Sequence, residues 1–463
     1  MGFTNSLVHR LASQETRLRA SWFSVTNVTY SVLTRNAARH SALTMICPAG
    51  TKGLRLKPDL LLVTPQKSTM KTIKLALTSI AVATFLTACG GGGDSSTGAF
   101  DTRIRFAQVV TFGDSLSDVG SYQVGTVAAL GGGKFTVNGV DNNVWSQALA
   151  ASLGAGTQCA AQTGLLPNNS ATGAAVVNNP LCNNYAQGSG RVTAVGSGPN
   201  GVALQKPPFN QVNLGLIADS IQNQMNRHLT KVSAFGATDL VTVNGGANDF
   251  FVQLGGLGAA ATGGAAAQGA ATLAGWPAAT VAAVGAGGAD AVNAASGAAV
   301  AAMGQAGAEL AMYVKTLIVA KGAKYVVVRN LADINSTPLG LAFSTPTKQL
   351  STAMTTTFND NLKRGLDGVA GVIYFDDYAR GQAITANPSA FGYSNATGTA
   401  CGLNAFSLPG DTVGSSIICT AKTLVPGDTS RYFFADSVHP TPFAAQGASA
   451  FTVDLLRKAG LNF

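Results

Sequence analysis

The sequence predicts an α/β fold in which a mainly parallel sheet lies between two layers of helices. Short apolar segments typical of strands occur at 106–112, 239–244, 324–329 and 372–375, and segments with helical periodicity separate them. Parallel strands need long crossover connections, which are usually helices, so this alternation favours an α/β/α sandwich. The first strand leads into a tight turn, Gly113-Asp114, and then into Ser115, after which a helix can begin at Leu116. Sites in such sheets lie where strands end, so this turn is a candidate centre of chemistry.

The N-terminal region has the pattern of an export signal. Residues 70–88 have a basic start, a short apolar core and small residues before Cys89, as in a secretory signal peptide. The segment Leu86-Thr-Ala-Cys89 resembles a bacterial lipobox, which implies cleavage before Cys89 and attachment of a lipid to its sulfur. Gly90 then suggests outer-membrane sorting, by analogy with lipoproteins of Gram-negative bacteria. The alternative is an ordinary signal peptide and a secreted protein.

The other N-terminal segments have no predicted fold. We expect translation to start at Met70, so that 1–69 is a wrongly assigned or non-structural extension; a genuine N-terminal extension is the alternative. Residues 89–100 are rich in Gly and Ser and are typical of a flexible tether. Residues 101–463 then form one folded domain, which we expect to be a monomer.

The net charge of +9 comes from the N-terminal region. Residues 1–88 contain 11 Lys and Arg against 2 Asp and Glu, whereas the rest of the chain contains 19 of each. The balanced remainder gives no electrostatic reason to expect a nucleic-acid partner.

Four cysteines remain beyond the signal and its lipobox. Export makes disulfides plausible, and we favour the local pairs Cys159–Cys182 and Cys401–Cys419, although four cysteines allow three pairings. No Cys-x-x-Cys spacing occurs and His is scarce, so we expect no metal site and no cofactor.

The remaining elements follow in chain order. We expect helices at 143–153, 210–229, 309–320, 347–365 and 442–459, a strand with a glycine turn at 184–191, and loops at 154–183, 245–251 and 382–431. Residues 254–307 are dominated by Ala and Gly. They predict an inserted helical hairpin or a partly ordered lid, and we favour filler over a lid for an acyl chain.

Ser115 can act as a nucleophile only if a base activates it. A helix-capping role is the simpler alternative for a serine in this position. Two histidines lie beyond residue 88. His228 sits in a helical segment next to Arg227, where a solvated surface role is expected. His439 follows Asp436 by three residues, and such an aspartate can orient and stabilise the imidazole.

Two further segments supply candidate donors for an oxyanion. One is the backbone of the turn Gly188-Ser189-Gly190, and the other is the side-chain amide of Asn248. Both also fit ordinary turns, because Gly and Asn-Asp pairs are common turn residues.

Taken together and in this order, four segments resemble the GDSL, or SGNH-hydrolase, family of lipases and esterases. The segments are Phe112-Gly-Asp-Ser-Leu-Ser-Asp-Val-Gly120, Asn184-Tyr-Ala-Gln-Gly188, Gly245-Gly-Ala-Asn-Asp249 and Asp436-Ser-Val-His-Pro440. The resemblance implies a flavodoxin-like sheet of about five parallel strands. It implies Ser115 as nucleophile, His439 as base and Asp436 as its partner. It also implies oxyanion donors from the Ser115 backbone, Asn248 and Gly188, with Ser189 as the alternative to Gly188 because relatives often have Gly-Gly there.

These observations predict an exported, lipid-anchored serine ester hydrolase that acts on a small-molecule or lipid ester. The alternatives on the same fold are an acyltransferase and a carbohydrate deacetylase. A non-catalytic binding lipoprotein of the cell envelope is a further alternative, although such a protein would not need Ser115, Asn248, Asp436 and His439 together.

Overall fold

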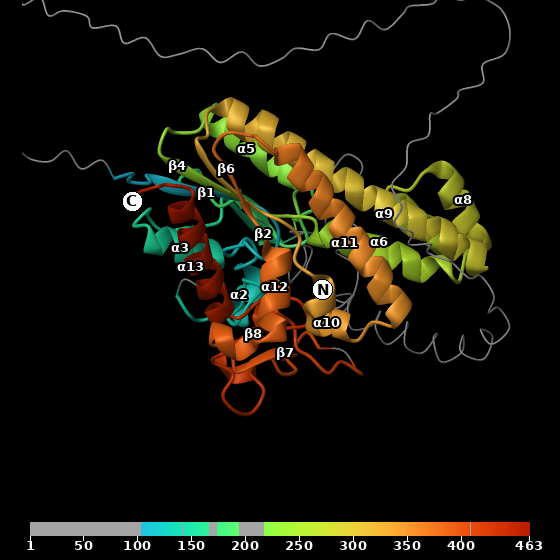
Figure 1. The fold of residues 1–463 in the computed structure, drawn as a ribbon. Coiled ribbons are helices and arrows are strands. Elements are labelled where there is room, and N and C mark those ends of the chain that lie inside the picture. The colour runs from blue at the N-terminus through green and yellow to red at the C-terminus, as the bar shows by residue number, and fades with distance from the viewer. Residues whose placement is uncertain (1–102, 142, 166–173, 194–216, 408) are drawn as a thin grey trace, which may run out of the picture. The chain divides into compact units, whose positions relative to one another are not determined.

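A parallel four-stranded sheet forms the centre of the fold (Figure 1). The computed structural model describes residues 103–141, 143–165, 174–193, 217–407 and 409–463. The expected extension 1–69, signal 70–88, tether 89–100 and lipid-anchor residue Cys89 lie outside the described residues. The sheet has the order β1-β4-β5-β6, with β1 at Gln108–Phe112, β4 at Asp239–Val243, β5 at Tyr325–Arg329 and β6 at Val372–Phe375. All three pairings are parallel, which confirms the predicted α/β class.

The strand side chains alternate between two hydrophobic cores, as a sheet covered on both faces requires. Val109, Leu240 and Val327 belong to one core, whereas their neighbours Val110 and Val241 belong to the other. Helices α3 (Trp145–Ser152) and α13 (Pro442–Lys458) cover the first face. The second face is covered by α5, α6, α9 and α11, which span Ile221–Val232, Ala247–Ala260, Gly288–Tyr313 and Thr345–Leu366.

A fifth segment extends the sheet beyond β1. The Thr111 N–H donates to Asn183 O at 3.0 Å, and the N–H groups of Tyr185 and Gln187 donate to Thr111 O and Gly113 O at 2.8 and 3.1 Å. The strand expected at 184–191 is therefore reduced to a short run of bridges beside β1. Counting this segment, the spatial order matches the 2-1-3-4-5 order of flavodoxin-like sheets.

Most expected helices are present, with corrected ends. Of the helix expected at 210–229, residues 210–216 lie outside the described residues, and the described part begins at Ile221, where the Ser220 side chain caps it by accepting from the Asn223 N–H at 3.2 Å. The helix expected at 309–320 is the end of α9, which starts at Gly288 and continues into a π-helical turn, Val314–Ile318, and a short 3₁₀ turn. Helices α11 and α13 begin near the predicted residues, at a Ser or Thr cap followed closely by Pro.

The Ala- and Gly-rich segment forms helices that belong to the core. Between α6 and α9 it contains α7 (Gly264–Leu273) and α8 (Ala278–Ala286). Helix α9 lies along α11, as Figure 1 shows. A Cβ at Gly307 would collide with Phe358 O, and a Cβ at Gly304 would lie 2.9 Å from Thr357 Cγ2. The small residues therefore allow two long helices to approach closely, and the segment is not filler.

The remaining elements are short. They are α2 (Gly125–Ala129), α10 (Pro338–Leu341), α12 (Asp377–Ala386), the hairpin β2–β3 (Gln162–Leu165 and Ala174–Asn178), and the pair β7–β8 (Asn395–Thr399 and Tyr432–Phe434). Part of the expected loop 382–431 is thus ordered as α12, β7 and brief 3₁₀ turns. Among the described helices, none is long and apolar enough to cross a membrane.

Two disulfides, Cys159–Cys182 and Cys401–Cys419, join the pairs favoured from the sequence.

Candidate active site

The turn after β1 is held in place from two sides. The Gln224 side chain accepts from the Gly113 N–H at 2.8 Å and donates to Gly113 O at 2.9 Å. A Cβ at Gly113 would collide with the side chain of Asn244, which follows β4. Asn244 Nδ2 in turn donates to Asp114 Oδ1 at 2.7 Å. Glycine is therefore required at 113, and the turn that carries Ser115 is fixed to its neighbours.

No helix begins at Leu116, contrary to the expectation. Residues 115–117 form a turn, and the Leu116 N–H donates to Asp114 Oδ1 at 3.0 Å. The second serine of the turn, Ser117, has both of its hydrogen bonds to side chains. Its Oγ donates to Asn244 Oδ1 at 2.5 Å and accepts from Trp145 Nε1 at 2.7 Å. Ser115 is thus not a helix cap, and its hydroxyl is available for other interactions.

Ser115, His439 and Asp436 form a continuous hydrogen-bonded chain. His439 Nε2 lies 3.0 Å from Ser115 Oγ, and His439 Nδ1 lies 2.8 Å from both carboxylate oxygens of Asp436. The three residues are only 6 %, 2 % and 5 % exposed, respectively. The structure therefore brings together the three residues singled out from the sequence, across 324 positions between Ser115 and His439.

Backbone N–H groups fix the Asp436 carboxylate. Oδ1 accepts from the N–H groups of Val438 and His439 at 3.0 and 2.8 Å, and Oδ2 accepts from the Ser416 N–H at 3.2 Å. Burial alone would raise the pKa of Asp436, but the neighbouring His439 and these hydrogen bonds hold it well below its usual range. Asp436 is thus an anion wherever His439 can act as a base.

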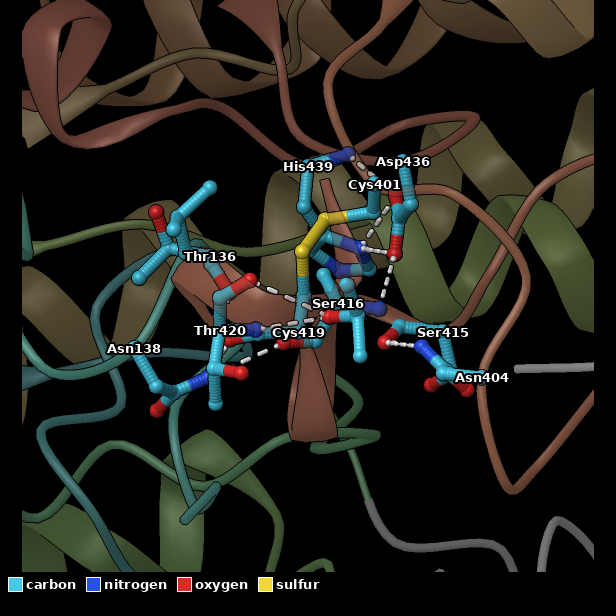
Figure 2. The surroundings of a disulfide bond; sticks show 12 residues. Thr136, Asn138, Cys401, Asn404, Ser415, Ser416, Cys419, Thr420, Asp436 and His439 are labelled. Atoms are coloured by element: carbon cyan, nitrogen blue, oxygen red, sulfur yellow. Dashed lines mark hydrogen bonds and ion pairs between the residues drawn. A yellow bond between two sulfur atoms is a disulfide. The ribbon is translucent and has the colours of Figure 1, made fainter. Parts of the chain in front are cut away.

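The loop that supplies the Ser416 N–H is closed by a disulfide (Figure 2). Cys401–Cys419 encloses it, and the Cys401 N–H donates to Ala435 O at 2.8 Å. The Asn138 side chain donates to Cys419 O at 3.1 Å. Neither spacing nor composition links Ser416 to Asp436, so the contact of this loop with the site could not be predicted from the sequence.

Phe135 is a second neighbour that the sequence did not indicate. Its ring packs against the His439 imidazole at a centroid distance of 5.3 Å. A Cβ at Gly188 would collide with the same ring, which gives a packing reason for glycine at 188. Phe135 thus limits the rotation of the imidazole and separates it from solvent.

The candidate oxyanion donors differ in whether their N–H groups are already engaged. The Gly188 N–H is engaged, because it donates to Asp118 Oδ2 at 2.9 Å. Ser189 adopts a left-handed conformation with φ of 67°, and its N–H has no acceptor among the described residues. The structure therefore favours the alternative, Ser189, over Gly188. The Ser115 N–H likewise has no acceptor within the described part of the chain.

Asn248 lies in the first turn of α6 and not in the loop expected at 245–251, because this helix begins at Ala247. Asn248 Nδ2 donates to Gly190 O at 2.9 Å, which ties α6 to the glycine turn. An amide nitrogen has two hydrogens, so one remains for a ligand.

His228 does not belong to this site, and it is not at the surface. It is 1 % exposed, stacks on Phe235 and lies 3.2 Å from the Tyr185 hydroxyl through Nδ1. Burial, assisted by Lys231, lowers the pKa of His228 to about 4, so it is a neutral core residue.

Two cavities open beside Ser115. They enclose about 760 and 550 Å³, including the space open to solvent, and both are lined by Ser115 and Leu116. Across the described residues, no three His, Cys, Asp or Glu side chains are grouped as metal ligands.

No protein-family model matches the chain, and no curated protein matches it. The geometry of the site therefore carries the functional argument.

Proposed function

We propose that the protein is a serine hydrolase of carboxylic esters, with Ser115 as nucleophile, His439 as general base and Asp436 as the orienting carboxylate. The observation that carries this proposal is the unbroken chain from Asp436 through His439 to Ser115, at 2.8 and 3.0 Å. A binding module would have no need for this geometry. The order of the strands and the four sequence segments also support the finer proposal that the fold is that of the SGNH hydrolases.

The proposed reaction has two steps. His439 Nε2 takes the Ser115 proton as Oγ forms a bond to the ester carbonyl carbon, and the carbonyl electrons move to the oxygen. When the electrons return, the bond to the alcohol oxygen breaks, and that oxygen takes the proton from His439. Water then attacks the acyl-enzyme by the same route, which releases the acid and restores Ser115.

The developing oxyanion needs donors that are already in place. The free N–H groups of Ser115 and Ser189 and the second hydrogen of Asn248 are the donors that the site offers. Two of the three belong to turns fixed by side chains, since Asn244 and Gln224 hold the first and Asp118 holds the second.

Hydrolysis of nitrophenyl esters by the full chain tests the proposal. Ser115→Ala is expected to abolish turnover, and Asp436→Asn to lower kcat about 10³- to 10⁴-fold, because the imidazole loses its charged partner. Ser351→Ala is the matched control, since Ser351 is also buried but lies on α11. A fluorophosphonate should label the wild type and the Ser351 variant but not the Ser115 variant. Equal turnover in the wild type and Ser115→Ala would refute the mechanism.

A further inference from the structure

The two cavities beside Ser115 share part of their lining, but only one of them is lined by the base. His439 lines the second cavity, together with Asn244, Ala247 and Phe251, but it does not line the first. In ester hydrolysis the base must give its proton to the oxygen of the leaving alcohol. The alcohol therefore leaves on the side of the second cavity. The acyl group, which stays on Ser115, extends into the first.

We propose that the first cavity binds an unbranched aliphatic acyl chain, and this assignment rests on the ester hydrolysis proposed above. Three alanines of α13, Ala444, Ala445 and Ala448, line this cavity along one turn of the helix. Their small side chains leave open the space that larger residues would fill. Val144, Trp145 and Phe434 add further apolar surface.

The charged residues of this cavity do not favour a charged acyl group. Arg329 Nη2 lies 2.5 Å from Asp377 Oδ2, and Arg380 Nη1 lies 3.6 Å from Asp377 Oδ1. The Arg329 guanidinium also stacks over Trp145, 4.5 Å from the ring centroid. Asp333 accepts from Ser336 Oγ and Gln382 Nε2 at 3.0 and 2.9 Å. Asp377 thus offsets part of the charge of the two arginines, and Asp333 is held by neutral donors, whereas Arg329 Nε has no hydrogen-bond partner among the described residues. Ion pairs and hydrogen bonds already engage most of these polar atoms, so the alanines and aromatic rings supply the surface that an acyl chain would contact.

This lining predicts a preference for longer chains. Each methylene transferred from water into an apolar site improves binding roughly fourfold. An acetyl group would leave most of the first cavity to water, whereas an octanoyl chain would fill more of it. We therefore expect kcat/KM for the octanoyl ester to exceed that for the acetyl ester at least tenfold.

A larger side chain on α13 tests the assignment. Ala448→Leu should lower the ratio of kcat/KM for nitrophenyl octanoate to kcat/KM for nitrophenyl acetate at least tenfold, with Ala448→Val giving a smaller effect. Ala450→Leu is the matched control, because Ala450 is exposed on the same helix. Circular dichroism and thermal unfolding report whether each variant is folded. An unchanged ratio between the two esters in folded Ala448→Val and Ala448→Leu would overturn the acyl assignment but leave the esterase standing.

A binding measurement separates this proposal from the catalytic one. Calorimetric titration of octanoate into Ser115→Ala should show binding that Ala448→Val, added to that variant, weakens. If the wild type hydrolyses no ester, the proposed function fails, whereas octanoate binding with this dependence would keep the cavity as a site for aliphatic chains. Absence of octanoate binding to Ser115→Ala would overturn the cavity assignment, whatever the enzyme hydrolyses.

Discussion

At the scale of single residues, two buried titratable side chains respond to acid in opposite directions. Burial, assisted by Lys231, lowers the pKa of His228 to about 4 from 6.5. Burial raises the pKa of Asp118 from 3.8 to about 6, although three backbone N–H groups oppose it. Between pH 6.5 and 4 the unfolded chain binds a proton at position 228 that the folded chain does not, so stability falls on acidification. Between pH 6 and 3.8 the folded chain retains a proton on Asp118 that the unfolded chain loses, so stability rises on acidification.

His228→Phe should therefore change the pH dependence of stability. The free energy of unfolding of the variant minus that of the wild type is expected to be about 3 kcal/mol larger at pH 4 than at pH 7. The reason is that only the wild type bears the cost of keeping His228 neutral in acid. Urea unfolding at the two pH values measures this difference. Asp118→Asn is a control with the opposite sign. As the pH falls from 7 to 4 it should lose stability relative to the wild type, because it lacks the proton uptake that stabilises the folded wild type. Parallel pH profiles for all three proteins would contradict the assigned pKa values.

His228 also shows how residue type can mislead where spacing does not. Position 228 lies three residues after Met225 and seven after Ile221, so helical spacing places it on the apolar face, and the surface role expected beside Arg227 was wrong. The buried side of α5 is formed by Ile221, Gln224, Met225 and His228. This stripe has ordinary helical spacing, but half of it is polar. Gln224 is buried because it bonds both polar groups of Gly113, a contact that depends on the distant turn.

At the scale of elements, the close approach of α9 and α11 depends on glycine. Gly307→Ala is expected to destabilise the protein by about 1–3 kcal/mol, because the added methyl collides with Phe358 O. Gly297→Ala on the exposed side of the same helix should stabilise it by about 1 kcal/mol, since a Cβ there meets no atom within 4 Å. Thermal unfolding of the two variants gives the comparison. Equal stabilisation by both would show that the helices can move apart.

The two disulfides close loops of similar length but have different neighbours. Replacing either pair by serine should cost about 3 kcal/mol, because the sequence separations are 23 and 18 residues. Only Cys401→Ser/Cys419→Ser should also lower kcat, by about 10- to 100-fold, because the Ser416 N–H then no longer holds Asp436 in position.

Kinetics well below the melting temperature separate these two effects. Cys159→Ser/Cys182→Ser is the control, with kcat expected near the wild-type value. A loss of kcat of equal size in both double variants would mean that stability, and not the position of Asp436, sets the rate.

At the scale of the whole molecule, long-range pairing limits what the sequence can predict. The strand positions followed from apolar, β-branched runs, and the Ser115–His439–Asp436 set followed from the scarcity of histidine and from the resemblance of four segments to a known family. The bridges of 183–187 to β1 depend on a partner more than 70 positions away. The choice between Gly188 and Ser189 depends on which way a backbone N–H points, and the carboxylate of Asp118 decides that direction.

Localisation is a property of the whole chain and remains a prediction. Cys89→Ala should release the protein from the membrane fraction and abolish incorporation of labelled palmitate, because the variant lacks the sulfur that would carry the lipid. Fractionation of cells that express the full chain measures both. Persistent palmitate labelling would exclude Cys89 as the anchor, and a soluble wild type would favour the secreted alternative.

The wide separation of Ser115 and His439 has a consequence for biosynthesis. Strand β1 is synthesised first, and its partner strand β4 is not synthesised until about 130 residues later, as the pairing of Gln108 with Asp239 shows. The base and its carboxylate emerge later still, just before the last helix. A nascent or prematurely terminated chain thus carries a serine with no base. Because His439 is synthesised late, the Ser115 hydroxyl stays unreactive until the fold can be completed.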